Sequence, residues 1–150
     1  MILTSILLLY NRAGEKQIIL LREKAKLTQT ILKAKSNSIN TLITNEPICG
    51  YGVHFESDSY LIFKDRGTDC VASDRIYSSN DPEELVERTS LPVSLYIARA
   101  DVRDILFMPP NPFVFFDSSL ANNEADFVIS TQDNKSSINL KLNSNGQVSE

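Results

Sequence analysis

Apolar and polar positions follow two different periods along the chain, and the period changes near Pro47. From residue 11 to about residue 40, apolar residues recur every three or four positions, which is the spacing of one face of an α-helix. The apolar positions are Leu20, Leu27, Ile31 and Ala34, with Leu21, Ala25, Thr28 and Leu32 beside them, and the polar side carries Arg22, Lys26, Gln29 and Lys33. The pattern predicts a long amphipathic helix whose apolar stripe can lie on a sheet.

The residues before this helix are almost wholly apolar. Residues 1–10 are MILTSILLLY, and no proline separates them from the helical segment. We therefore expect one continuous rod whose first part is apolar on every side. A bilayer span needs about 20 apolar residues, and a signal peptide would need a basic region before the apolar run. The segment is half of a membrane span, the start of a buried helix, or the leading strand of a sheet.

After Pro47 the chain consists of short alternating or apolar runs, which are typical of β-strands. These runs cover residues 52–55, 60–63, 93–98, 105–107, 113–116, 127–130 and 138–142. The Asn145-Gly146 pair favours the positive φ angles of a two-residue hairpin, so residues 137–143 should pair with a short final strand at about 147–149. A small antiparallel sheet is therefore expected.

Two further segments carry local signals. Residues 81–84, Asp-Pro-Glu-Glu, predict the cap and acidic first turn of a short helix that ends near Arg88. The three prolines at positions 109–112 disfavour helix and predict an extended crossing between strands. This order of elements places the chain in the α+β class, with a long N-terminal helical spine at residues 1–44 packed on a small antiparallel β-sheet head at residues 45–150.

The charge of the chain is unevenly distributed. The length of 150 residues suits one globular domain with an appendage, and the contents of hydrophobic (42 %) and charged (23 %) residues are ordinary. Residues 1–45 hold seven Lys and Arg against two acidic residues, and the remainder holds eight against seventeen. A basic helix beside an acidic head is compatible with a membrane-proximal stem, a nucleic-acid arm or subunits that pack stem against head. A solvated helix face is the simpler interpretation.

Candidate catalytic chemistry is sparse. A nucleophile–base pair would have to use His54, the single histidine, and its place in an alternating strand favours a structural role. No phosphate-loop, zinc-protease or nucleophile-elbow motif occurs in the sequence. Asp65, Asp69 and Asp74 surround Gly67 without EF-hand spacing, which favours a solvated acidic loop over a calcium site. We predict a non-enzyme, with no catalytic residues, no cofactor and no metal.

The two cysteines, Cys49 and Cys70, lie twenty-one residues apart and flank a predicted hairpin. An even count is compatible with one disulfide in a domain exported from the reducing cytosol. Closing a loop of that size adds about 3 kcal/mol in the chain-entropy model. Two buried free thiols are the alternative. A zinc site would need carboxylate ligands, because the chain has one histidine.

Several segments, taken in order, resemble the type IV pilin-like proteins, and most closely the minor pseudopilin H and FimT-like group of type II secretion and type IV pilus systems. The matching segments are ILTSILLLY before a charged stem, CGYGVHF before YLIFKD, DPEELVERTSLP before VSLYI, ILFMPPNPFVFF, and INLKLNSNGQVS. They cover nearly the whole chain. The N-terminus departs from this family, because a basic leader, a Gly-Phe cleavage point and a glutamate four residues later are missing. We therefore expect Met1 to be an internal start and the chain to be N-terminally truncated.

The resemblance implies a structural subunit of a secretion or pilus-like fibre. A prepilin peptidase would trim the leader of the precursor, the helix would cross the cytoplasmic membrane once, and the head would be periplasmic or extracellular. The expected partners are other pilin or pseudopilin subunits and the membrane, and not nucleic acid. Assembly contacts are expected from Ile6, Leu7, Leu8, Leu9, Leu20 and Leu21, for which ordinary core packing is the alternative.

Two other functions stay open. A DNA-uptake minor pilin would share this architecture, although the acidic head shows no cluster of basic residues for phosphate. A soluble extracytoplasmic β module for binding would instead bury residues 2–9 against its own sheet. Deleting residues 1–10 would destabilise such a module, whereas it would make a pilin-like chain more soluble.

Overall fold

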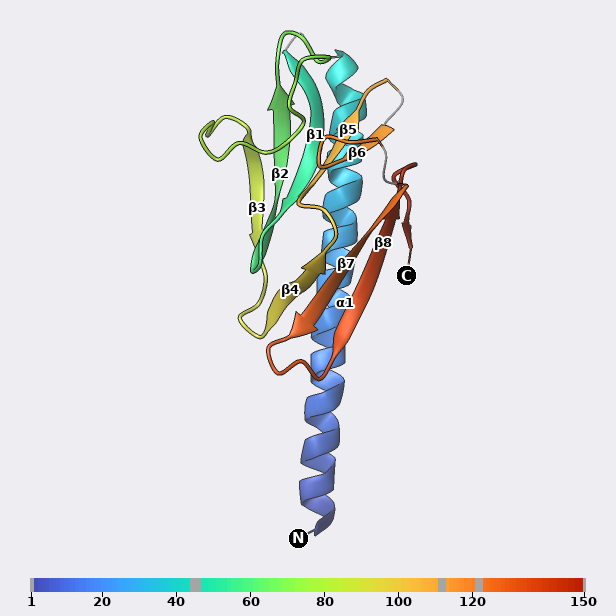
Figure 1. Cartoon of the computed structure of the whole chain (residues 1–150). Helices are drawn as coiled ribbons and strands as arrows, with labels where there is room; N and C mark the ends of the chain where they lie inside the picture. The colour runs from blue at the N-terminus through green and yellow to red at the C-terminus, as the bar shows by residue number, and fades with distance from the viewer. Residues whose placement is uncertain (1, 44–46, 111–112, 121–122, 150) are drawn as a thin grey trace.

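The computed structural model describes residues 2–43, 47–110, 113–120 and 123–149, with side chains from Gly14 onward. Its first element is one long helix, α1 (Ile2–Asn40), followed by a short 3-10 turn, η1 (Thr41–Ile43). The strands that follow form two antiparallel sheets, and α1 runs along both of them (Figure 1). The predicted α+β class, with a long N-terminal helix packed on antiparallel sheet, is confirmed.

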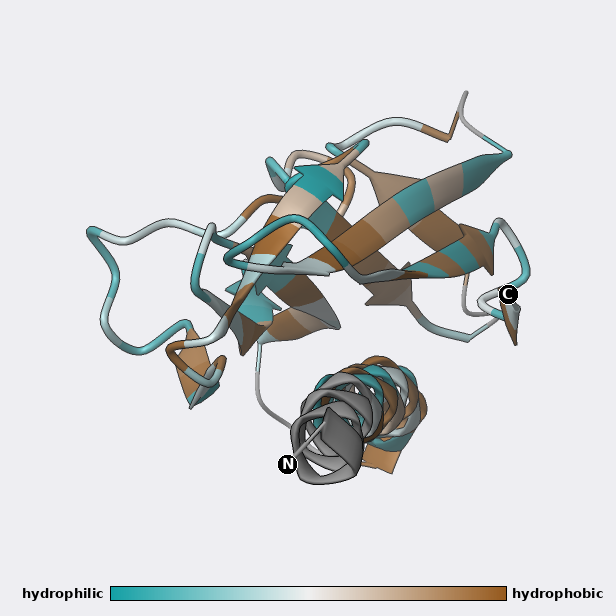
Figure 2. Ribbon diagram, turned by 90° about the horizontal axis from the view of Figure 1, so that it is seen from below, coloured by the Kyte–Doolittle hydropathy of each residue, from teal (hydrophilic) through white to brown (hydrophobic). Residues whose placement is uncertain are grey.

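The larger sheet has the strand order β3-β2-β1-β5-β6, and the smaller sheet has the order β4-β7-β8-β9. The larger sheet consists of β1 (Ile48–Phe55), β2 (Ser59–Arg66), β3 (Leu85–Ser90), β5 (Asp104–Met108) and β6 (Phe113–Phe116). The smaller sheet consists of β4 (Leu95–Ala100), β7 (Glu124–Thr131), β8 (Ser137–Asn143) and β9 (Val148–Ser149). Seen from below in Figure 2, both sheets lie on the same side of α1.

The main core lies between α1 and the two sheets. The helix contributes Leu20, Leu27, Ile31 and Ala34, which are at most 3 % exposed and share one face of the helix. The sheets contribute side chains from alternate strand positions, among them Val53, Phe55, Ile62, Ile105, Phe127, Ile129, Leu140 and Leu142. Each large buried side chain contributes about 1.5–3 kcal/mol. Because residues of both sheets pack in the same core, the head is one folded unit.

The opposite face of the larger sheet carries a second, smaller core. This core consists of Leu61, Phe63, Leu106 and Phe115, with Tyr77 and Met108 packed against it. Successive strand residues point to opposite faces, so Leu61 belongs to this core while Ile62 packs toward α1. Tyr77 comes from residues 67–84, which connect β2 to β3 and which we call the strap. The larger sheet is therefore packed on both faces, by α1 on one and by the strap on the other.

The short helix predicted at residues 81–88 is wrong. The segment makes one turn, in which Glu84 N donates to Asp81 O (3.1 Å) and Glu83 N donates to Asp81 Oδ1 (3.0 Å), and it then enters β3. The expected capping chemistry is present, but it closes a turn. An isolated helix of this length is marginal in water, whereas pairing with β2 satisfies the backbone groups along one edge of β3.

The connection at residues 109–112 also differs from the prediction. It joins two antiparallel neighbours, since Met108 of β5 lies opposite Phe113 of β6, and it does not cross between distant strands. Pro109 and Pro110 form a turn, and Pro112 lies outside the described residues. Proline is tolerated here because a turn at the sheet edge leaves its missing N–H without consequence.

The predicted Asn145-Gly146 hairpin joins β8 to β9, but its loop is longer than two residues. Gly146 N donates to Asn143 O (2.9 Å), and strand pairing resumes where Leu142 lies opposite Val148. Gly146 has a φ angle of 70°, and Asn145 does not share the positive sign. Glycine is favoured at this position because residues with a Cβ rarely adopt the left-handed region.

Candidate functional site

The side of α1 that faces away from the sheets carries a second row of apolar side chains. Ile18, Leu21, Leu32 and Ile39 are 45–60 % exposed, and Ala25 is exposed between them. Their separations of three, four and seven residues place them on one face of the helix. We call these five residues the stem stripe, and Figure 2 shows that neither sheet covers this side of α1.

The stem stripe lies far around the helix from the core residues. At 100° per residue, Leu32 is about 140° away from Leu27. The outer side of a surface helix is normally polar, and contiguous exposed apolar residues mark interaction surfaces. Exposed apolar side chains therefore recur on a second side of the helix, where Gln29 and Ser36 are interspersed with them. The head of the same chain covers the other side.

A groove of about 490 Å³ continues the stem stripe onto the head. It lies where α1 leaves the head, with Leu20 and Leu21 on the helix side and Ile138 of β8 on the sheet side. Polar residues from the β7–β8 connection, including Lys135 and Ser136, form its rim. The groove therefore joins Leu21 to the smaller sheet through a lining of mixed polar and apolar side chains.

Basic side chains border the stem stripe. Residues 14–43 contain six Lys and Arg against two Glu. Intramolecular ion pairs join Lys16 to Asp133, Lys26 to Glu23 and Lys33 to Glu87. Arg22 has no ion-pair partner within the described part of the chain, and Lys35 Nζ donates to the backbone oxygen of Asn145 (3.0 Å). No carboxylate in the described part of the chain therefore balances the charges of Arg22 and Lys35.

The six predicted assembly residues occupy different environments. Residues 6–9 lie in α1, and the structure describes their backbone but not their side chains. Leu20 is 3 % exposed and packs in the main core, whereas Leu21 is 56 % exposed and belongs to the stem stripe. Core packing is therefore the role of Leu20, and Leu21 is available to a partner.

The strap is fastened to the outer face of the larger sheet by covalent and polar contacts. Cys49 and Cys70, the candidate disulfide pair, are bonded, with 5.1 Å between their Cα atoms. The Arg75 guanidinium lies 4.5 Å from the centre of the Phe115 ring, which is within the range of a cation–π contact. The Ser73 hydroxyl donates to Asp65. These contacts hold one long connection in a defined conformation.

The strap carries more acidic than basic charge, and part of it is buried. Residues 67–84 contain five acidic side chains and one basic one, Arg75. Burial raises the pKa of Asp65, and the nearby carboxylate of Asp74 raises it further. Burial also raises the pKa of Glu84, with Asp81, Asp74 and Asp65 adding to the effect. Negative potential therefore accumulates around the strap. The predicted solvated loop is wrong for Asp65, which is 2 % exposed.

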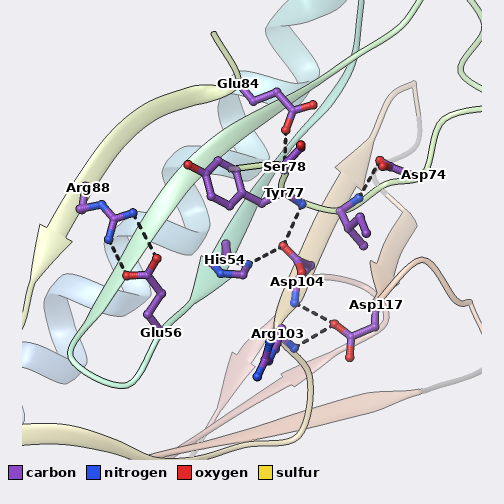
Figure 3. Close-up of polar contacts among 11 residues, drawn as sticks. His54, Glu56, Asp74, Tyr77, Ser78, Glu84, Arg88, Arg103, Asp104 and Asp117 are labelled. Atoms are coloured by element: carbon purple, nitrogen blue, oxygen red, sulfur yellow. Dashed lines mark hydrogen bonds and ion pairs between the residues drawn. The ribbon is translucent and has the colours of Figure 1, made fainter. Parts of the chain in front are cut away.

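His54 links β1, β5 and the strap through polar contacts (Figure 3). Its Nδ1 lies 2.9 Å from Asp104 Oδ1, and the same oxygen accepts a hydrogen bond from Tyr77 N (3.1 Å). Asp117 Oδ1 accepts from the backbone N–H groups of Arg103 and Asp104 (2.8 Å each). No hydroxyl or thiol in the described residues is hydrogen-bonded to His54 as a nucleophile would be. The geometry is that of a structural bridge between strand ends.

A buried polar pair between α1 and β2 is absent from the sequence predictions. Glu23 is 1 % exposed; its Oε1 accepts from Lys26 Nζ (2.7 Å), and its Oε2 has no partner among the described atoms. Burial together with the charge of Glu23 raises the pKa of the buried Tyr60 to about 12, and the Thr30 side chain opposes this shift. The available signal was a glutamate in the apolar register of the helix, three residues after Leu20.

Neither a membrane span nor a metal centre is found within the described ranges. No helix there combines the length and apolar character needed to cross a bilayer, and no group of three or more His, Cys, Asp or Glu side chains is placed to hold a metal ion. Comparisons with protein-family models, with curated proteins and with solved structures find no match to this chain.

Proposed function

We propose that this chain is a structural subunit of a type II secretion or type IV pilus-like fibre, of the minor pilin or pseudopilin kind. The observation that carries the proposal is the stem stripe, because its exposed apolar side chains recur along a side of α1 that the chain's own head does not cover. The order of sequence segments that resembles the pilin-like proteins supports the same assignment. So does the architecture, in which a single long helix continues past the head (Figure 1).

In this proposal the helix has two tasks. Its leading apolar part, residues 2–9, lies in the cytoplasmic membrane before assembly and among neighbouring helices afterwards. Its remaining part holds the head through the main core and offers the stem stripe to neighbouring subunits. The head is then presented outside the cytoplasmic membrane, and a prepilin peptidase acts on the precursor where that precursor carries the family's leader.

The free energies involved indicate that the leading apolar part of α1 and the stem stripe must act together in association. Covering the four large side chains of the stem stripe, each about half exposed, contributes about 3–6 kcal/mol. Association costs about 4–15 kcal/mol in lost translational and rotational freedom. The stem stripe alone supports a weak contact at most, so burial of the leading apolar segment has to contribute the remainder.

The two alternative functions fit the observed surfaces less well. A soluble module whose helix packs entirely on its own sheet leaves the stem stripe without a role. A DNA-binding head would present a cluster of free basic side chains, whereas four of the eight basic residues of the head are engaged in ion pairs. These pairs are Arg66 with Glu83, Arg88 with Glu56, Arg99 with Asp101, and Lys141 with Glu124.

The test compares two glutamate substitutions at exposed positions. Leu21→Glu places a charge in the stem stripe and should weaken self-association of the full chain in detergent about tenfold or more. Val93→Glu is the control, because Val93 is 95 % exposed on the head. Sedimentation velocity measures association, and thermal unfolding checks that both variants stay folded. Equal association of the two variants, or a wild-type chain that stays monomeric at every concentration, would contradict the proposal.

A further inference from the structure

We propose that the stem stripe of one copy docks on the strap of the next copy, in a head-to-stem contact. This inference rests on the proposed function and deepens it, because it names the surface that covers residues 18–39 of each helix. The occupant is a second copy of this chain, and charge complementarity between its two surfaces is the main argument.

The charges around the stem stripe disfavour a second stem as the occupant. Arg22 and Lys35 have no carboxylate partner among the residues with described side chains, and residues 14–43 as a whole carry six basic against two acidic side chains. Two such helices packed stripe to stripe would bring like charges together, which destabilises helix–helix contacts. An apolar surface with an acidic surround is the better complement.

The strap has that composition. Val71 is 86 % exposed and Ile76 is 38 % exposed. Asp69 and Asp74 are exposed on either side of Val71 in the chain. Glu83 is exposed further along and forms an ion pair with Arg66. Exposed apolar side chains among carboxylates match an apolar stripe bordered by lysine and arginine. Opposite potentials of this kind set the register and the rate of association.

The strap is also held in place before any partner arrives. The Cys49–Cys70 disulfide ties its beginning to β1, Tyr77 N donates to Asp104 in its middle, and Ser78 N donates to Glu84 Oε2 (2.7 Å) near its end. A connection of eighteen residues would otherwise lose conformational freedom on binding. Preorganisation removes much of that cost and makes the strap suitable as a docking surface.

The two surfaces lie on opposite faces of the larger sheet. Helix α1 packs on the face that contains Val53 and Ile105, and the strap packs on the face that contains Leu61 and Phe115. One copy can therefore use its stem stripe and its strap at the same time, with a different neighbour at each. A contact between two different surfaces propagates as an open chain when its rotation does not close. A fibre requires this kind of contact.

Zero-length crosslinking of mixed light and isotopically heavy copies tests the contact. The full chain in detergent, at a concentration where it associates, is treated with a carbodiimide, which joins lysines to carboxylates in direct contact. The expected inter-copy products link stem lysines, such as Lys24 or Lys26, to strap carboxylates, such as Asp69, Asp74 or Glu83. Inter-copy products that link the stem to other acidic residues, or a lack of stem products from associated chains, would overturn the inference.

A mixing experiment tests whether the contact joins two different surfaces. Leu32→Glu blocks the stem stripe and Val71→Arg blocks the strap, and each alone should associate about tenfold more weakly than the wild type. An equimolar mixture should regain pairing, because the intact stem of the Val71→Arg copy meets the intact strap of the Leu32→Glu copy. A mixture that behaves as the sum of the separate variants would overturn the head-to-stem contact.

A matched pair of arginine substitutions separates this inference from the proposed function. Arg22→Glu should weaken association, and Arg103→Glu should not, although both arginines are exposed and have no ion-pair partner among the described residues. If the wild type associates but both variants match it, the fibre proposal stands and the head-to-stem contact fails. If the wild type does not associate, both fail together.

Discussion

Neighbouring residues in this chain have opposite roles when the helix or strand turns them to different sides. Leu20 lies in the main core and Leu21 is 56 % exposed, although both are leucines in the same helix. The difference follows from the rotation of 100° per residue, which separates adjacent side chains. Composition cannot distinguish the two positions, whereas their contacts do.

Asp65 has a buried carboxyl group, and the folded state of the protein disfavours its charged form. Burial raises its pKa, with the hydroxyl of Ser73 opposing and Asp74 reinforcing the shift. Because the pKa of Asp65 is raised in the folded state, the contribution of Asp65 to stability is complete below its unfolded-state pKa of about 3.9. That contribution is lost as the pH rises through the folded-state pKa. At pH 7 the ionisation of Asp65 therefore favours the unfolded state.

Replacing Asp65 with asparagine tests this sign. Asp65→Asn keeps the side-chain shape and an acceptor for Ser73, so we expect a larger free energy of unfolding than wild type at pH 7. The difference should shrink as the pH falls toward 4, where the wild-type carboxyl becomes protonated. Urea unfolding at several pH values measures it. A variant that is less stable than wild type at pH 7 would show that the hydrogen bond to the charged form dominates.

Asp133 provides a control of opposite sign. Its pKa is held below the ordinary range by Lys16, with the Thr131 hydroxyl and Lys135 N as further donors. A lowered pKa contributes stability above the unfolded pKa, and that contribution is lost as the pH falls. Asp133→Asn should therefore reduce stability at pH 7 by a small amount, because the group is exposed, and the reduction should fade in acid.

At the scale of elements, the strap depends on its disulfide more than on its own core. Few residues of the strap pack on the sheet. Among the hydrophobic ones, Tyr77 packs against the second, smaller core on the outer face of the larger sheet. Most of its other contacts are polar or lie at the surface. The covalent link from Cys70 to β1 therefore sets how closely this long connection follows the sheet.

Removing the disulfide should loosen the strap before it unfolds the head. A Cys49→Ser/Cys70→Ser variant is expected to lose about 3 kcal/mol of unfolding free energy in the chain-entropy model for a loop of this size. Hydrogen exchange should rise first in residues 67–84, while the part of α1 in the main core keeps its protection. Uniform loss of protection in the strap and α1 would contradict this order, and a Thr68→Ser variant, which leaves the disulfide intact, serves as the control.

At the scale of the whole molecule, the head and the leading part of the helix are separable. Among the helix residues whose side chains are described, core contacts begin with Ile19 and Leu20, and residues 14–18 are exposed. The extension below the head in Figure 1 is therefore not needed for the main core. A self-contained module would instead depend on its first residues for stability.

Deleting residues 1–13 distinguishes these two arrangements. We expect the free energy of unfolding of the shortened chain to lie within about 0.5 kcal/mol of that of the full chain, because changes at the surface usually have small effects. It should also stay in solution without detergent and lose self-association. Chemical unfolding and sedimentation velocity measure the two effects. A large loss of stability on deletion would favour the soluble module and contradict the fibre subunit.

Hydrophobic periodicity by itself determined the main elements of this protein. The spacing of Leu20, Leu27, Ile31 and Ala34 identified the helix and its core face, and the alternating runs located most of the strands, including β6 with its observed bounds. These predictions succeed because burial of one face of an element leaves a repeating signature in the sequence.

The tertiary structure decided the features that depend on neighbours. Residues 81–84 carry the local signals of a helix start, yet the residues that follow form β3 because β2 offers an edge to pair with. Gly52 is required because a Cβ there would lie 2.3 Å from Ile105 O, a contact with another strand that no local pattern contains. The stem stripe is an exposed surface because the head covers a different side of α1. Local sequence encodes the period of each element, whereas partner choice arises from contacts between residues far apart in the chain.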